Sequence, residues 1–149
     1  MNKTFALLLP LCWSLAACAP TTQSASVIPN CPPGQTDRAC PSLPDGTPDP
    51  AKRNKIKIVV SAAGVKAKPS VVCTSPGETI TVTVVGIPAN AKVATVPKDG
   101  ADGWILSSRT GEGTTSIVVP GTTSDGDYGY FAMASTGKCV DPMIRVDRN

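Results

Sequence analysis

Three sulfur-bearing side chains near the end of the chain are the residues best suited to metal chemistry. They are Met133, Cys139 and Met143, within the stretch GDYGYFAMASTGKCVDPMIRV (126–146). Thioether and thiolate sulfur are soft ligands that suit Cu(I). The chain contains no histidine, so such a site would rest on sulfur alone. The alternative, which we favour, is that both methionines pack as fillers and Cys139 forms a disulfide; we expect no metal and no cofactor.

Two acidic stretches invite the same comparison. PKDGADGW (97–104) and SDGDYG (124–129) each place two aspartates beside glycine. Neither has the spacing of a full Ca²⁺ loop, which supplies six or more oxygens, and Asp–Gly turns explain both. Asp102 and Glu112 could form a catalytic pair only in a cleft that held them at a defined separation. Since histidine, the commonest general base, is missing too, we do not expect an enzyme.

The first residues, MNKTFALLLPLCWSLAACAP, have the layout of a secretory signal peptide: Lys3, an apolar stretch over 5–17, then small residues. This stretch is too short to span a bilayer. Leu15-Ala16-Ala17-Cys18 resembles the lipobox of bacterial lipoproteins, whereas Cys12 fits that pattern poorly. The resemblance implies that residues 1–17 are removed and that Cys18 is lipidated. Since Ala19 follows, it also implies the outer membrane, with the protein lipid-anchored and facing the periplasm.

The segment 18–54 is predicted to be a disordered, Pro-rich tether, because it has eight prolines and no periodic apolar pattern. It ends in four basic residues, Lys52, Arg53, Lys55 and Lys57. Such a cluster is typical of a solvated strand entry, although it could also favour an anionic surface. Without Lys3 the chain has 13 basic and 11 acidic residues, a balance too mild to indicate a nucleic-acid partner.

Four further cysteines remain once Cys12 and Cys18 are set aside: Cys31, Cys40, Cys73 and Cys139. An even number in an exported protein predicts two disulfides, for which three pairings exist. We expect Cys31–Cys40 within the tether and Cys73–Cys139 within the folded domain, because a tether cannot easily hold a fixed partner for a core cysteine.

The remaining residues, 55–149, show repeated period-2 alternation and predict one all-β domain. In ETITVTVV (78–85) the apolar residues alternate with threonines. Turn signals recur between such runs, which is typical of a single antiparallel β-sandwich of seven or eight strands. The predicted strands are 56–62, 67–74, 78–86, 91–96, 103–108, 114–119, 127–134 and 142–147.

The order of these elements resembles the cupredoxin family of copper-binding sandwiches. The features that carry it are an early strand, SPGETITVTV, SIVVPG and GDYGYFAMASTGKCVDPMIRV. In copper-carrying members a cysteine ends the strand that matches Tyr128–Ala132, and a histidine follows. This chain has Ala132 at that cysteine position and lacks the histidines, so the resemblance implies the fold without the copper ligands. An immunoglobulin-like sandwich is the alternative.

These observations predict a membrane-anchored envelope lipoprotein that acts as a non-catalytic binding or interaction module. Its expected partners are the membrane, through the lipid anchor, and an envelope protein. The alternatives are a structural envelope component without a discrete ligand and a protein that handles Cu(I) through sulfur ligands.

Overall fold

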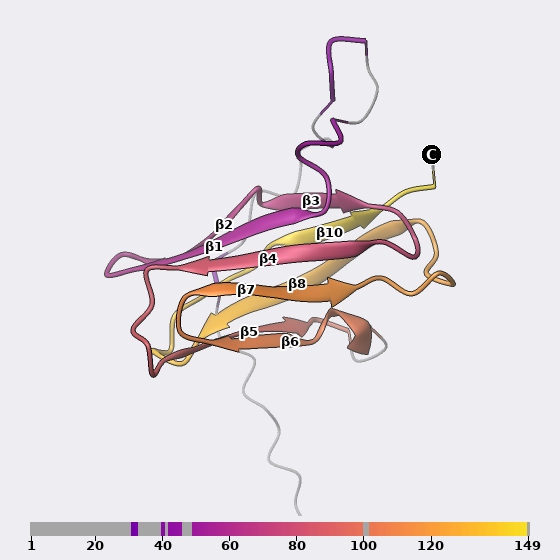
Figure 1. The fold of residues 1–149 in the computed structure, drawn as a ribbon. Helices are drawn as coiled ribbons and strands as arrows, with labels where there is room; N and C mark the ends of the chain where they lie inside the picture. Colours follow the sequence, from indigo (N-terminus) through magenta and orange to yellow (C-terminus); the bar gives the residue numbers. More distant parts are fainter. Residues whose placement is uncertain (1–30, 33–39, 41, 46–48, 100–101, 149) are drawn as a thin grey trace, which may run out of the picture.

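The computed structural model describes residues 31–32, 40, 42–45, 49–99 and 102–148 (Figure 1). The predicted signal peptide and Cys18 lie outside the described residues, as does most of the predicted disordered tether. Among the described residues, no helix is both long and apolar enough to cross a bilayer.

The described chain forms ten strands and one short 3₁₀ helix, which together confirm the predicted all-β fold. The alternation seen in the sequence produces them: β1 buries Ile56, Ile58 and Val60, while Lys57 between them is exposed and Val59 is half-buried. The elements are β1 (Lys55–Ser61), β2 (Gly64–Lys68), β3 (Val71–Thr74), β4 (Thr79–Val85), β5 (Lys92–Pro97), η1 (Gly103–Ile105), β6 (Ser107–Thr110), β7 (Gly113–Val118), β8 (Gly126–Ala134), β9 (Cys139–Val140) and β10 (Met143–Val146).

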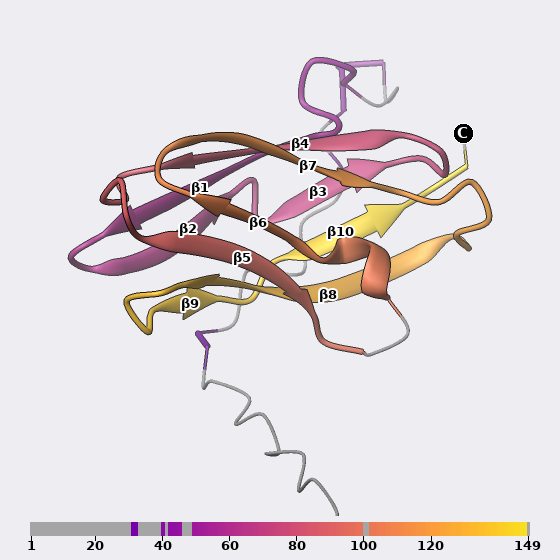
Figure 2. The ribbon, with the colours of Figure 1, turned by 60° about the horizontal axis from the view of Figure 1, so that its bottom comes forward.

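The strands form two sheets that pack face to face as a sandwich (Figures 1 and 2). One sheet has the order β2-β1-β4-β7. The other has the order β3-β10-β8-β5-β6, with β9 paired to β8. Between them lies one apolar core that includes the fully buried Ile58, Ile80, Ile117 and Ile144. Burial of such side chains stabilises the fold by about 1.5–3 kcal/mol each.

The sequence predicts purely antiparallel sheets, but each sheet of the structure also contains one parallel pair. The pairs β1–β4 and β3–β10 are parallel. Parallel neighbours need a crossover connection, and here the chain provides it by passing to the other sheet between the paired strands. The immunoglobulin constant-type sandwich has antiparallel sheets, so the topology favours the cupredoxin-like alternative.

Two predicted strands differ from the observed ones. The predicted strand 67–74 breaks into β2 and β3, which belong to different sheets. Pro69 lies at the break and has no N–H to donate to a ladder. The predicted strand 103–108 begins instead as the 3₁₀ helix η1, and only β6 pairs with β5.

The predicted disulfide pairing is wrong. Cys31 is bonded to Cys139, and Cys40 is bonded to Cys73. Each bond therefore joins the N-terminal segment to a strand of the six-stranded sheet. The predicted pairing requires a tether without fixed contacts, but Asp141 donates its backbone N–H to the Pro32 carbonyl at 3.2 Å, which holds the chain beside Cys31 against the sandwich.

The two disulfides lie toward opposite ends of the sandwich. Cys139 is the cross-strand neighbour of Met133 on β8. Cys73 is the cross-strand neighbour of Arg145 on β10, and Arg145 in turn is opposite Asp127 on β8. Six residues of a strand separate these two positions, which is roughly 20 Å. The N-terminal segment is thus held at both ends of the domain.

Candidate functional site

The three candidate sulfur ligands do not form one site. Met133 and Cys139 are cross-strand partners, but the Cys139 sulfur is committed to its disulfide with Cys31 and cannot act as a thiolate. Met143 pairs with Gly129, four residues along β8 from Met133, or roughly 13 Å away. In the part of the chain that the structure describes, no group of three or more His, Cys, Asp or Glu residues could hold a metal ion.

The aspartates of the stretch 124–129 bind arginines of the C-terminal strand region. Asp127 accepts two hydrogen bonds from Arg145, at 2.6 and 2.9 Å, and Asp125 lies 3.6 Å from Arg148. The hydrogen bond from Arg145 outweighs partial burial and holds the pKa of Asp127 below its usual range. These carboxylates therefore brace β8 against β10.

Asp102 and Glu112 have separate structural contacts. Asp102 precedes the 3₁₀ helix, where its carbonyl accepts the Ile105 N–H at 2.9 Å. The Glu112 carboxylate accepts the Gly86 backbone N–H at 2.5 Å. Glu112 therefore joins the β6–β7 turn to the end of β4, which is a structural contact.

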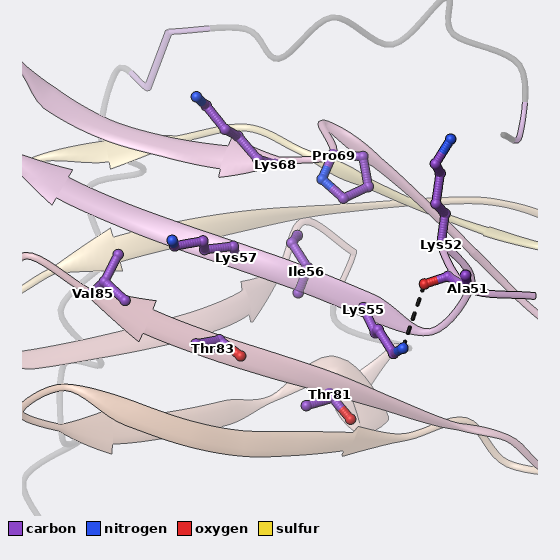
Figure 3. Close-up of a pocket in the computed structure, with 10 residues that line it drawn as sticks. All are labelled: Ala51, Lys52, Lys55, Ile56, Lys57, Lys68, Pro69, Thr81, Thr83 and Val85. Atoms are coloured by element: carbon purple, nitrogen blue, oxygen red, sulfur yellow. Dashed lines mark hydrogen bonds between the residues drawn. The ribbon is translucent and has the colours of Figure 1, made fainter.

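The feature that remains as a candidate is a groove on the outer face of the four-stranded sheet. It is open, has a volume of about 450 Å³, and is lined by Lys52, Lys55, Lys57 and Lys68 together with the Thr81 and Thr83 side chains. Figure 3 shows these side chains standing on β1, β2, β4 and the turn before β1. The same period-2 alternation that buries Ile56 and Ile58 places Lys55 and Lys57 on this face.

The register of β1 and β2 sets two rows of lysines side by side. Lys57 is directly opposite Lys68, and Lys66 is opposite Val59. Opposed residues of an antiparallel pair lie about 5 Å apart, and like charges in that position are destabilising. We call Lys55, Lys57, Lys66 and Lys68 the lysine face; all four are exposed.

Little negative charge compensates this face. Lys52, at the edge of the groove, lies 3.3 Å from the Asp49 carboxylate. The Lys55 amino group donates to the uncharged Ala51 carbonyl at 3.4 Å (Figure 3). Within the described residues, no acidic group forms a salt bridge with any of the four lysines of the face.

The sequence indicated only half of this arrangement. Lys55 and Lys57 belonged to the predicted basic cluster, but Arg53, assigned to the same cluster, is buried and bonded to Asp147 at 2.8 Å. Lys66 and Lys68 were missed. The signal that could have found them is their own period-2 spacing opposite Lys57, once β1 and β2 are joined as a hairpin.

No protein-family model and no curated protein sequence matches this chain. Solved structures similar to it include the reduced auracyanin of Roseiflexus castenholzii, at 16% identity and a TM-score of 0.43 over 64% of this chain and 98% of that one. Auracyanin A of Chloroflexus aurantiacus, a blue copper protein, has 15% identity and a TM-score of 0.40 over 62% and 98%.

The copper-containing nitrite reductase of Thermus scotoductus has 12% identity and a TM-score of 0.41, over 74% of this chain and 26% of that one. At such identities and scores, no property of these three proteins is assigned to this chain.

Proposed function

We propose that this chain is a lipid-anchored envelope protein that acts as a non-catalytic binding module, with the groove beside the lysine face as its contact surface. The observation that carries the proposal is the concentration of lysines, without acidic partners among the described residues, on one face of the domain, although the net charge of the full chain is only +3. Fixed positive charge of this kind attracts an anionic partner.

Two features support export and anchoring. The described cysteines are all oxidised, and disulfides persist in extracytoplasmic compartments. The lipobox-like Leu15-Ala16-Ala17-Cys18 supplies the acceptor for the lipid. We infer lipidation of Cys18, retention at the outer membrane and a periplasm-facing domain, with an envelope protein as a further partner.

Replacing Cys18 with serine tests the anchor. The variant is expected to leave the membrane fraction or to persist with its signal peptide uncleaved, because only the Cys18 thiol can accept the lipid. Cys12→Ser is the matched control and should fractionate like the native protein. The measurement is membrane fractionation with mass determination of the N terminus. A mature, membrane-bound Cys18→Ser protein would contradict the proposal.

A photoreactive residue at position 83 tests the binding surface in cells. Thr83 lines the groove, whereas Thr110, on β6 of the other sheet, is exposed and serves as the control. Irradiation is expected to give a discrete adduct, with a protein or a lipid, at position 83 and none at position 110, read by mass spectrometry. The absence of an adduct at position 83 would favour the alternative, a structural envelope component without a discrete ligand.

A Cu(I)-handling role has less support than either of these. It needs sulfur ligands that converge, yet Cys139 is bonded to Cys31, and Met143 on β10 pairs with Gly129, four residues along β8 from Met133.

A further inference from the structure

We propose that the lysine face docks on the anionic headgroups of the membrane to which the chain is anchored. This inference rests on the proposed function for the anchor, but it adds a second point of contact with lipid. The face consists of Lys55 and Lys57 on β1 and of Lys66 and Lys68 on β2, all exposed. Lys52, at the groove edge, adds a fifth amino group.

The arrangement of the amino groups fits a surface of many anions better than one small anion. Figure 3 shows the amino groups of Lys52, Lys55, Lys57 and Lys68 spread around the groove, with no single point on which they converge. Successive lysines on one strand are two residues apart, or about 6.6 Å. A lipid surface can set a separate phosphate opposite each amino group, whereas a free phosphate ion can reach few of them.

The groove combines lysine amino groups and threonine hydroxyl groups with an apolar lining from Ala51, Ile56, Pro69 and Val85. The hydroxyl groups of Thr81 and Thr83 lie on β4, beside Lys55 and Lys57 of β1, and can hydrogen-bond to phosphate or glycerol oxygens. Among the described residues, no aromatic side chain lines the groove, so we expect the contact to stay at the level of the headgroups without insertion into the acyl chains.

The disulfide at Cys31 keeps the domain near the lipid. Since Cys31 is bonded to Cys139 on β9, only the stretch from residue 18 to residue 31 lies between the proposed anchor and the domain. Thirteen residues reach about 40 Å if fully polyproline-like and about 20 Å as a flexible coil. Such a short link gives the lysine face a high effective concentration of headgroups, so modest affinity is enough for docking.

Like-charge repulsion within the face gives this proposal a second, independent readout. Lys57 and Lys68 are directly opposite each other, an arrangement that destabilises the free domain. Bound anions would relieve this repulsion. Lys68→Gln should therefore leave the melting temperature unchanged or raise it slightly, while it weakens binding to the membrane.

Vesicle co-sedimentation tests the proposal without the lipid anchor. The protein is the chain from residue 18 onward with Cys18→Ser, which keeps both disulfides and all ten strands. It should bind vesicles of equal parts phosphatidylglycerol and phosphatidylcholine but not vesicles of phosphatidylcholine alone. Binding should disappear in 1 M salt, where the Debye length is about 3 Å.

Removing single charges distinguishes the effect of the lysine face on binding from the effect of the net charge. Each lysine near an anionic surface contributes about fivefold to binding, so Lys68→Gln should lower the partition coefficient about fivefold and Lys57→Gln/Lys68→Gln about 25-fold. Lys92→Gln, at the exposed first residue of β5 on the other sheet, removes the same charge and should change the coefficient less than twofold. Equal losses for Lys68→Gln and Lys92→Gln would overturn the proposal, as would binding that ignores phosphatidylglycerol.

Two soluble probes distinguish other anions from lipid. Inorganic phosphate and heparin are each added while the amines of Lys57 and Lys68 are labelled with an acylating reagent. Stronger protection by anionic vesicles than by either probe is the expected result. Protection by heparin or phosphate but not by vesicles would assign the face to a soluble anion and refute membrane docking. Because the tested chain has no lipid, a failed anchor and a failed face give different results.

Discussion

Replacing Cys31 and Cys139 together with alanine is expected to lower the melting temperature by at least about 10 °C. The bond joins residues 108 apart in sequence, and in the chain-entropy model a loop of that size contributes about 5 kcal/mol, while measured losses of native disulfides span about 2–5 kcal/mol. A domain of this size has about 5–15 kcal/mol in total and loses roughly 4–8 °C per kcal/mol. The measurement is thermal unfolding followed by circular dichroism under non-reducing conditions.

The second disulfide provides the comparison. Cys40 and Cys73 are 33 residues apart, for which the same model gives about 4 kcal/mol, so Cys40→Ala/Cys73→Ala should be slightly less destabilising. An unchanged melting temperature for Cys31→Ala/Cys139→Ala would contradict a stabilising bond between these two residues. Peptide mapping of the non-reduced protein checks the bonds themselves.

The sequence predicted the strands well, because alternation is a local property. In β4, Ile80, Val82 and Val84 are buried and the threonines between them face outward, as the 78–85 pattern indicates. The pairing of strands is not local. Nothing in residues 55–61 shows that β1 lies parallel to β4, because that depends on the chain passing through the other sheet first.

The disulfide pairing failed for a similar reason. The sequence shows cysteines in a Pro-rich stretch, and proline content indicates extended backbone but not whether that backbone packs on a domain. Only the structure shows that the outer side of β3 is covered. Cys73 and Val71 lie on the side of β3 away from the core, yet they are almost fully buried. The lysine face was half predicted, since β2 had to be registered on β1 before Lys66 and Lys68 could be placed.

Arg53 is the residue whose role the sequence misplaced most. It stands among lysines and was predicted to be solvated with them, but its side chain is only 9% exposed. Its guanidinium donates to Asp147 and to the Ser75 hydroxyl, both at 2.8 Å, and lies 4.0 Å from Glu78. These partners come from the C-terminal end and from the β3–β4 connection, so a single side chain joins three separate parts of the chain.

Arg53→Ala is therefore expected to destabilise the protein by about 2–3 kcal/mol, measured by denaturant unfolding. Removing one partner of a buried ion pair costs 3–5 kcal/mol, and the loss here is smaller because Asp147 and Glu78 are 33% and 41% exposed and partly screened by water. Lys52→Ala is the matched control: Lys52 pairs with Asp49 but is 65% exposed, so its loss should cost under about 1 kcal/mol.

The pH dependence of the stability lost in Arg53→Ala identifies the cause of that loss. Partial burial acts to raise the pKa of Glu78, but the Ser75 N–H, the Asn54 side chain and the Arg53 charge outweigh it and hold that pKa below its ordinary value of 4.5. A carboxylate whose pKa is lowered by folding stabilises the fold at pH values above the pKa that it has in the unfolded chain. This contribution is lost as the pH falls through the lower pKa that it has in the folded protein. The gap in stability between the native protein and Arg53→Ala should thus be full at pH 7 and narrow below about pH 4. A gap that stayed constant over this range would mean that Arg53 acts by packing alone, and a loss equal to that of Lys52→Ala would mean that the buried ion pair does not hold the three segments together.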